Sequence, residues 1–158
     1  MFNRGSHSMR YLAIDLGARR TGLAFGDDET VIATPHDTVV TSDPEQRLVL
    51  ILREIEREQP DALVIGLPLN MDGTEGPGAK EARSVAEELT RRTGLTAHLA
   101  DERLSTAEAD EQMSGHGLTR KDKKNRRDAL AAAAILRRFL ESLNQPGDPD
   151  AASDASPN

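Results

Sequence analysis

The feature that most constrains the fold is a short apolar run that ends in a carboxylate, Leu12-Ala13-Ile14-Asp15-Leu16-Gly17. Such a run predicts a buried strand with Asp15 at its end. An ionised carboxylate in that position is costly unless a metal ion or another cation offsets its desolvation. The alternative is an ordinary turn aspartate that caps the strand. Two further acidic positions, Asp101-Glu102 and Asp128, favour the metal interpretation.

The pattern of apolar residues predicts three strands followed by alternating helices and strands. Strands separated by helices pair in parallel through right-handed crossovers, whereas consecutive strands with short turns pair antiparallel. The expected fold class is therefore α/β, with a mixed five-stranded sheet flanked by helices. The expected strands are 10–15, 21–26, 31–40, 62–67 and 95–100. The first expected helix has Ser42 or Asp43 as its N-cap and ends before Pro60. The other expected helices lie at 80–93, from Ser105 over a short stretch, and at 128–143, with loops at 68–78 and 115–127.

Length and composition predict one domain with two appendages. The 158 residues suffice for one domain. Residues 1–8 are expected to be an expression-vector remnant before a native start at Met9, residues 9–144 the domain, and residues 145–158 a disordered acidic tail. The lack of cysteine and of long apolar runs fits a cytoplasmic protein with no membrane partner. The net charge of -7 means that nucleic-acid binding must come from local basic patches.

The acidic positions are expected to converge at one edge of the sheet. The first strand is central, and its long-range neighbours meet at its carboxyl end. Alternation loosens at a strand end, so the pattern leaves open whether Asp101 or Glu102 reaches Asp15. Asp128 is expected to open the last helix, whose alanines allow a close approach to the sheet. The alternatives are a solvated turn at Asp101-Glu102 and a purely helix-dipole role for Asp128.

A gathering of three carboxylates has a definite chemical consequence. In a poorly solvated site the carboxylates repel one another by several kcal/mol. The hard divalent cations Mg²⁺ and Mn²⁺ relieve that repulsion, since they take oxygen ligands and keep positions open for water and phosphate. Two such ions about 4 Å apart can activate a water and stabilise the leaving oxygen in phosphodiester cleavage. The residues therefore indicate metal-assisted phosphodiester hydrolysis.

Four segments, in this order, carry a resemblance to a known family. They are Asp15-Leu16-Gly17-Ala18-Arg19-Arg20-Thr21-Gly22-Leu23-Ala24, Val64-Ile65-Gly66-Leu67-Pro68-Leu69-Asn70-Met71-Asp72-Gly73, Asp101-Glu102-Arg103-Leu104-Ser105-Thr106 and Asp128-Ala129-Leu130-Ala131-Ala132. With them the chain resembles the YqgF family, also called RuvX, of Holliday-junction-resolvase-like or pre-16S rRNA nucleases. The resemblance covers nearly all of residues 9–143. It implies a ribonuclease H-like fold and a nuclease that depends on Mg²⁺ or Mn²⁺.

The resemblance also implies the site residues. Asp15, the acidic pair and Asp128 carry over as the metal-binding and catalytic set. Within the pair Glu102 is the first choice, because glutamate is the family's recurrent position, and Asp101 is the second. A role in maturing the 5′ end of 16S rRNA is implied on the same ground.

Several cationic and polar residues near the expected site are candidates for nucleic-acid binding. Arg20 lies in the hairpin turn, Asn70 in the loop on the expected active face, and Arg103 directly after the acidic pair. The alternatives are a solvated arginine, a plain mobile loop and a structural salt bridge, respectively. A run of six cations in eight residues directly precedes Asp128 and is a candidate phosphate contact, and the alternative is a solvated loop. The cations are Arg120, Lys121, Lys123, Lys124, Arg126 and Arg127.

Three functions remain under consideration. The first is a metal-dependent nuclease acting on structured nucleic acid, with pre-16S rRNA as substrate, and the second is a Holliday junction resolvase acting on branched DNA. The third, a non-catalytic nucleic-acid-binding domain, is disfavoured because the chain keeps its carboxylates. An actin-like phosphotransferase would need a second domain that 158 residues do not supply. His98 and His116 are expected to be structural or surface residues, and the oligomeric state is open.

Overall fold

A mixed five-stranded sheet forms the centre of the fold, as the sequence predicts. The computed structural model describes residues 8–104 and 120–144. The sheet has the order β3-β2-β1-β4-β5, with antiparallel pairing from β3 to β1 and parallel pairing from β1 to β5. The strands are β1 (Arg10–Asp15), β2 (Arg20–Asp27), β3 (Ala33–Val40), β4 (Ala62–Leu67) and β5 (Ala97–Asp101).

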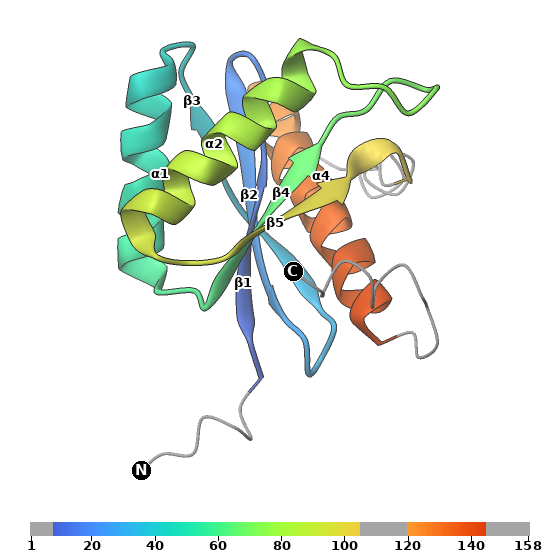
Figure 1. Ribbon diagram of the computed structural model, residues 1–158. Coiled ribbons are helices and arrows are strands. Elements are labelled where there is room, and N and C mark those ends of the chain that lie inside the picture. The colour runs from blue at the N-terminus through green and yellow to red at the C-terminus, as the bar shows by residue number, and fades with distance from the viewer. Residues whose placement is uncertain (1–7, 105–119, 145–158) are drawn as a thin grey trace.

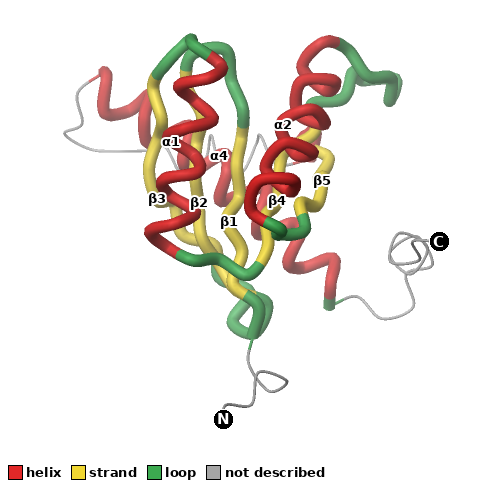
Figure 2. The backbone as a smooth tube through the Cα atoms, turned by 60° about the vertical axis from the view of Figure 1, so that its left-hand side comes forward, coloured by secondary structure: helices red, strands yellow, loops and turns green. Residues whose placement is uncertain are grey.

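Helices cover both faces of this sheet (Figures 1 and 2). α1 (Pro44–Glu58) and α2 (Pro77–Thr93) lie on one face, and α4 (Arg120–Leu143) crosses the other. A short 3₁₀ turn, η2 (Glu102–Leu104), follows β5. The sheet is thus buried between two helical layers, which explains why the run at 62–67 is apolar throughout.

The alternation of side chains along β1 assigns its residues to the two layers. Leu12 and Ile14 pack beneath α1 and α2, whereas Tyr11 and Ala13 pack beneath α4. Asp15 continues the second series. The carboxylate at the end of β1 therefore belongs to the face that α4 covers.

Local signals set the ends of α1 and α2. Asp43 caps α1 by accepting a hydrogen bond of 3.1 Å from the backbone N–H of Glu45. The helix ends where Gln59 adopts a left-handed conformation (φ 53°) just before Pro60. α2 begins at Pro77, three residues before the predicted start, because proline is well suited to the first turn.

Several predicted boundaries need correction. β2 is one residue longer at each end, β5 covers 97–101 instead of 95–100, and β3 starts at Ala33 because Val31 has a φ of 59°, which interrupts an extended strand. The largest correction concerns α4, which begins at Arg120 rather than Asp128, so the predicted loop is wrong over 120–127. Lysine and arginine are good helix formers, and a turn made of charged residues carries no apolar stripe, so hydrophobic periodicity does not detect it.

Other predictions fall on residues that the structure does not describe. These are the short helix from Ser105, His116, nearly all of the 1–8 remnant, and the 145–158 tail. Among the described helices, none has the length and apolar content that a membrane crossing requires.

Candidate active site

Two carboxylates meet on the α4 face at the end of β1. Asp15 ends β1, and Glu102 opens η2 directly after β5. Glu102 continues the alternation of His98 and Ala100, which lie on the α4 side of β5. It therefore shares a face with Asp15, and the two side chains are within hydrogen-bonding reach of each other.

Burial and mutual repulsion perturb this pair. Burial raises the pKa of Asp15 to about 8, with further contributions from the charge and hydrogen bond of Glu102 and from the charge of Asp128. Burial also raises the pKa of Glu102, which its hydrogen bond with Asp15 partly opposes. Without a bound cation, the pair is therefore expected to share a proton at neutral pH.

The third carboxylate, Asp128, comes from α4. The prediction that Asp128 opens the helix is wrong, because about two helical turns precede it. The helix-dipole interpretation is wrong for the same reason, since the dipole effect is confined to the first turn. Burial raises the pKa of Asp128, and the Arg20 charge opposes that rise. Asp15, Glu102 and Asp128 thus form one electrostatically coupled group from three elements, called the carboxylate cluster below.

Two glycines make room for the carboxylate cluster. Gly22 is the cross-strand partner of Asp15, and a Cβ there would lie 1.9 Å from the carbonyl oxygen of Asp128, so α4 passes very close to β2. A Cβ at Gly66 would lie 2.5 Å from a carboxylate oxygen of Glu102. The close approach expected from the alanines of the helix thus depends equally on glycines in the sheet.

Arg20 lies against the third carboxylate. Its Nε is 3.1 Å from Asp128 Oδ2, and its Nη2 donates a hydrogen bond of 2.6 Å to Asn125 Oδ1. Both Nε and Oδ2 are buried, and neither has a hydrogen-bond partner, so their 3.1 Å contact is an ion pair without hydrogen-bond alignment. A buried carboxylate oxygen without a partner is available as a ligand, so the donor set of the cluster fits a hard divalent cation.

The carboxylate cluster is not gathered as tightly as a closed metal site. Among the described residues, one set of three ligand-type side chains has its ligand atoms within 4.8 Å of one another, namely His36, Glu54 and Glu58 on β3 and α1. His36 already pairs with Glu54 at 3.0 Å. In the carboxylate cluster, Asp128 instead stays beside Arg20.

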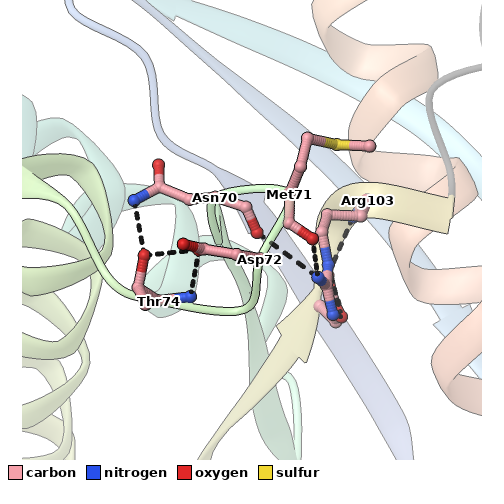
Figure 3. Close-up of polar contacts among 6 residues, drawn as sticks. Asn70, Met71, Asp72, Thr74 and Arg103 are labelled. Atoms are coloured by element: carbon pink, nitrogen blue, oxygen red, sulfur yellow. Dashed lines mark hydrogen bonds and ion pairs between the residues drawn. The ribbon is translucent and has the colours of Figure 1, made fainter.

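Asp101 does not join Asp15 but pairs with Arg103. Arg103 donates to both oxygens of Asp101, from Nε at 3.1 Å and from Nη2 at 2.7 Å, and these bonds lower the pKa of Asp101. Its Nη1 lies 3.3 Å from the carbonyl oxygens of Asn70 and Met71 (Figure 3). Arg103 therefore fastens the loop after β4 to the end of β5, the structural role considered as its alternative.

The loop after β4 is more regular than its composition suggests. Leu69 and Glu75 form a β-bridge across it. Asn70 Nδ2 donates to Thr74 Oγ1 at 2.9 Å, and Asp72 accepts a bond of 3.0 Å from the backbone N–H of Thr74 (Figure 3). The Asn70 side chain is thus engaged within the loop itself.

The cationic run lies along the first turns of α4. Arg126 and Arg127 are exposed and directly precede Asp128. The same helix backbone carries the other four cations, Arg120, Lys121, Lys123 and Lys124. Because the run is helical, its backbone is fixed relative to the carboxylate cluster.

The RuvX family profile, described as "Holliday junction resolvase", matches residues 9–142. The chain belongs to the RuvX family. A relative from Anaeromyxobacter sp. (strain Fw109-5) is 44% identical over 133 residues, which cover 84% of this chain and 97% of the relative. Another from Opitutus terrae is 42% identical over 139 residues, covering 87% of this chain and 95% of the relative. Both are named "Putative pre-16S rRNA nuclease".

Solved structures identify the fold of this RuvX chain. RuvC of T. thermophilus in complex with a Holliday junction substrate matches with a TM-score of 0.53 and 17% identity, over 85% of this chain and 94% of that chain. The Fowlpox virus resolvase with Holliday junction DNA matches with a TM-score of 0.57 and 12% identity, over 87% and 100%. These resolvases have the ribonuclease H-like fold, so the expected fold is confirmed.

Sequence reasoning missed a buried arginine that supports the RuvX site. Arg47 of α1 is buried and donates to Glu81 Oε2 at 2.7 Å and to the carbonyl oxygen of Gly17 at 3.3 Å. It thereby ties both helices of one layer to the turn that follows Asp15. The signal for it was available: Arg47 is four residues before Ile51, on the buried stripe of an amphipathic helix.

The raised pKa of Asp15 predicts a pH-dependent stability of the metal-free protein. Folded Asp15 holds its proton up to about pH 8, whereas the unfolded group loses it near pH 4. The unfolding free energy should therefore fall as pH rises through this window, by about 2 kcal/mol between pH 6 and pH 8. Denaturant unfolding in a chelator at the two pH values measures it. The same fall in Asp15→Asn would contradict the assignment to Asp15.

Proposed function

We propose that this RuvX protein is a divalent-metal-dependent nuclease that hydrolyses phosphodiester bonds in structured nucleic acid, with the 5′ end of pre-16S rRNA as its substrate. One observation carries the proposal: Asp15, Glu102 and Asp128 gather on one sheet face, buried enough to raise the pKa of Asp15 to about 8. Such a group is unfavourable without a cation and offers the oxygen ligands that Mg²⁺ and Mn²⁺ take. The name of the relatives supports the RNA substrate.

Each member of the carboxylate cluster has a proposed role. Asp15 and Glu102 would hold the metal together, giving up their shared proton as the cation binds, and Asp128 would complete the set from α4. Bound Mg²⁺ or Mn²⁺ would supply an activated water and neutralise charge on the phosphate. Asp101 would stay outside the set, because Arg103 occupies both of its oxygens.

The start of α4 is the proposed phosphate-binding surface. A helix rises about 1.5 Å per residue, so the eight-residue cationic run would extend for about 12 Å along a nucleic-acid backbone. Such contacts give salt-sensitive affinity that is largely independent of sequence. Arg20 is a further candidate for a phosphate contact. For Asn70 and Arg103 we propose an indirect role, since both are engaged in shaping the loop beside the site.

A Holliday junction resolvase is the second candidate. The description of the family profile and the junction complexes of the structural neighbours favour it. Symmetric cleavage of a two-fold junction would require a dimer, so the oligomeric state separates the two candidates. A pre-rRNA substrate requires a cytoplasmic location, which we propose on that ground alone.

A cleavage assay tests the proposed function. The purified protein is incubated with Mg²⁺, Mn²⁺ or a chelator, and with a labelled precursor 16S rRNA 5′ end or a four-way DNA junction. We expect cleavage of the precursor with either metal and none with the chelator. Preferential cleavage of the junction would favour the resolvase. Binding to both nucleic acids with no cleavage under any condition would support a non-catalytic binding domain and overturn the proposal.

A further inference from the structure

Arg20 holds the third carboxylate of the cluster through a two-point contact with α4. Its Nε lies beside Asp128 Oδ2 at 3.1 Å, and its Nη2 donates to Asn125 Oδ1 at 2.6 Å. Asn125 and Asp128 are three residues apart, so they lie on the same face of the helix. A guanidinium, which is charged at any ordinary pH, is thus fixed against a carboxylate proposed to bind metal.

The contact between Arg20 and Asp128 is an incomplete ion pair. Nε and Oδ2 are buried, and neither takes part in an aligned hydrogen bond. The Arg103–Asp101 pair differs, because Arg103 donates aligned bonds from Nε and Nη2. A contact between two buried charged atoms that lacks hydrogen-bond alignment recovers less of their desolvation cost than an aligned pair does. Arg20 therefore keeps Asp128 in place by its charge, but Asp128 Oδ2 still lacks a hydrogen-bond donor.

The placement of Asp128 follows from this contact. Asp15 and Glu102 reach each other, whereas the three carboxylates together do not lie within the 4.8 Å spread of a candidate metal site. Moving Asp128 toward the other two without a cation would bring a further negative charge to a pair that already shares a single proton. Leaving it with Arg20 avoids that cost.

We propose that Arg20 neutralises Asp128 when no metal is bound, and that it competes with the divalent metal for the Asp128 carboxylate. Metal binding would transfer Asp128 from Arg20 to the Asp15–Glu102 pair. The released guanidinium would stay tethered near the site through Asn125, where it can bind a phosphate oxygen of the substrate. This inference rests on the proposed function only in assuming that the carboxylate cluster binds a divalent cation.

Side-chain NMR tests the exchange directly, without substrate or turnover. The Nε–H signals of ¹⁵N-labelled protein are followed during a Mg²⁺ titration, with Arg20→Lys and Arg103→Lys used for assignment. The Arg20 signal should shift to a new position with the same apparent Kd that calorimetry gives for Mg²⁺. The Arg103 signal should stay in place, because its carboxylate partner lies outside the cluster. An unmoved Arg20 signal at metal saturation would overturn the inference.

Metal affinity provides the second test. Arg20→Gln should bind Mn²⁺ about tenfold more tightly by calorimetry, because the competing cation is gone. Arg127→Gln is the matched control, since it removes the same charge beside Asp128 but leaves Arg20 in place, and we expect a change of at most about twofold. An equal gain in Mn²⁺ affinity in both variants would contradict the inference, because any nearby positive charge would then act as Arg20 does. If neither the parent protein nor any variant bound metal, the proposed function itself would fail. That result differs from metal binding with an unchanged Arg20 NMR signal, which would overturn only this inference.

Discussion

Replacing Asp15 with asparagine is expected to abolish metal-dependent cleavage, with a loss in kcat of at least about a thousandfold, or about 4 kcal/mol of transition-state stabilisation. The asparagine keeps the shape of the side chain but removes the negative charge at the centre of the carboxylate cluster. Metal affinity should fall with it, because the other two carboxylates alone form a weaker site. The measurements are single-turnover cleavage of the precursor rRNA and calorimetry with Mn²⁺.

Stability separates a loss of chemistry from a loss of folding in this variant. Because burial raises the pKa of Asp15 to about 8, its ionised form is unfavourable in the folded protein. Asp15→Asn should therefore unfold at pH 8 with a free energy equal to or above that of the parent. Asp101→Asn is the informative comparison, since it neutralises the carboxylate next to Glu102 without entering the cluster, and it should keep most activity. Comparable activity losses in both variants would contradict the choice of Glu102.

The proximity of Asp15 and Glu102 is the part of the site geometry that follows most directly from the sequence. Apolar runs that end in acidic residues place Asp15 and the Asp101-Glu102 pair at strand ends, and the parallel pairing of β1, β4 and β5 brings those ends to one edge. The choice between Asp101 and Glu102 needs one further fact, namely which face α4 covers. Once that is known, Glu102 follows His98 and Ala100 onto that face.

The contacts of Asp128 could not be predicted in the same way. The alanines of α4 indicate close packing against the sheet, but hydrophobic periodicity fails over the charged turns that begin the helix. The Arg20 contact joins residues more than a hundred positions apart, and no local pattern encodes it. The contact of Arg103 with the loop carbonyls could not be predicted either, because every residue has a backbone carbonyl and the sequence does not indicate which one accepts.

Replacing Gly22 with alanine is expected to damage both stability and activity. The added Cβ would lie 1.9 Å from the carbonyl oxygen of Asp128, 2.4 Å from its carbonyl carbon and 3.0 Å from the nitrogen of Ala129. All three are backbone atoms, so no side-chain rotation can relieve the overlap, and α4 must move away from β2. We expect a loss of about 2–3 kcal/mol in the unfolding free energy, measured by denaturant titration.

The displacement matters for the site because Gly22 pairs with Asp15 on one side and touches Asp128 on the other. A shift of α4 therefore separates two members of the carboxylate cluster, and cleavage should fall well below the level that the lost stability explains. Gly76→Ala is the matched control, since its Cβ would meet nothing closer than 3.7 Å, and as an N-cap substitution it should cost only about 0.5–1 kcal/mol. If Gly22→Ala kept full metal affinity and activity at a temperature where it is folded, α4 would not hold Asp128 in the way that its close approach to β2 implies.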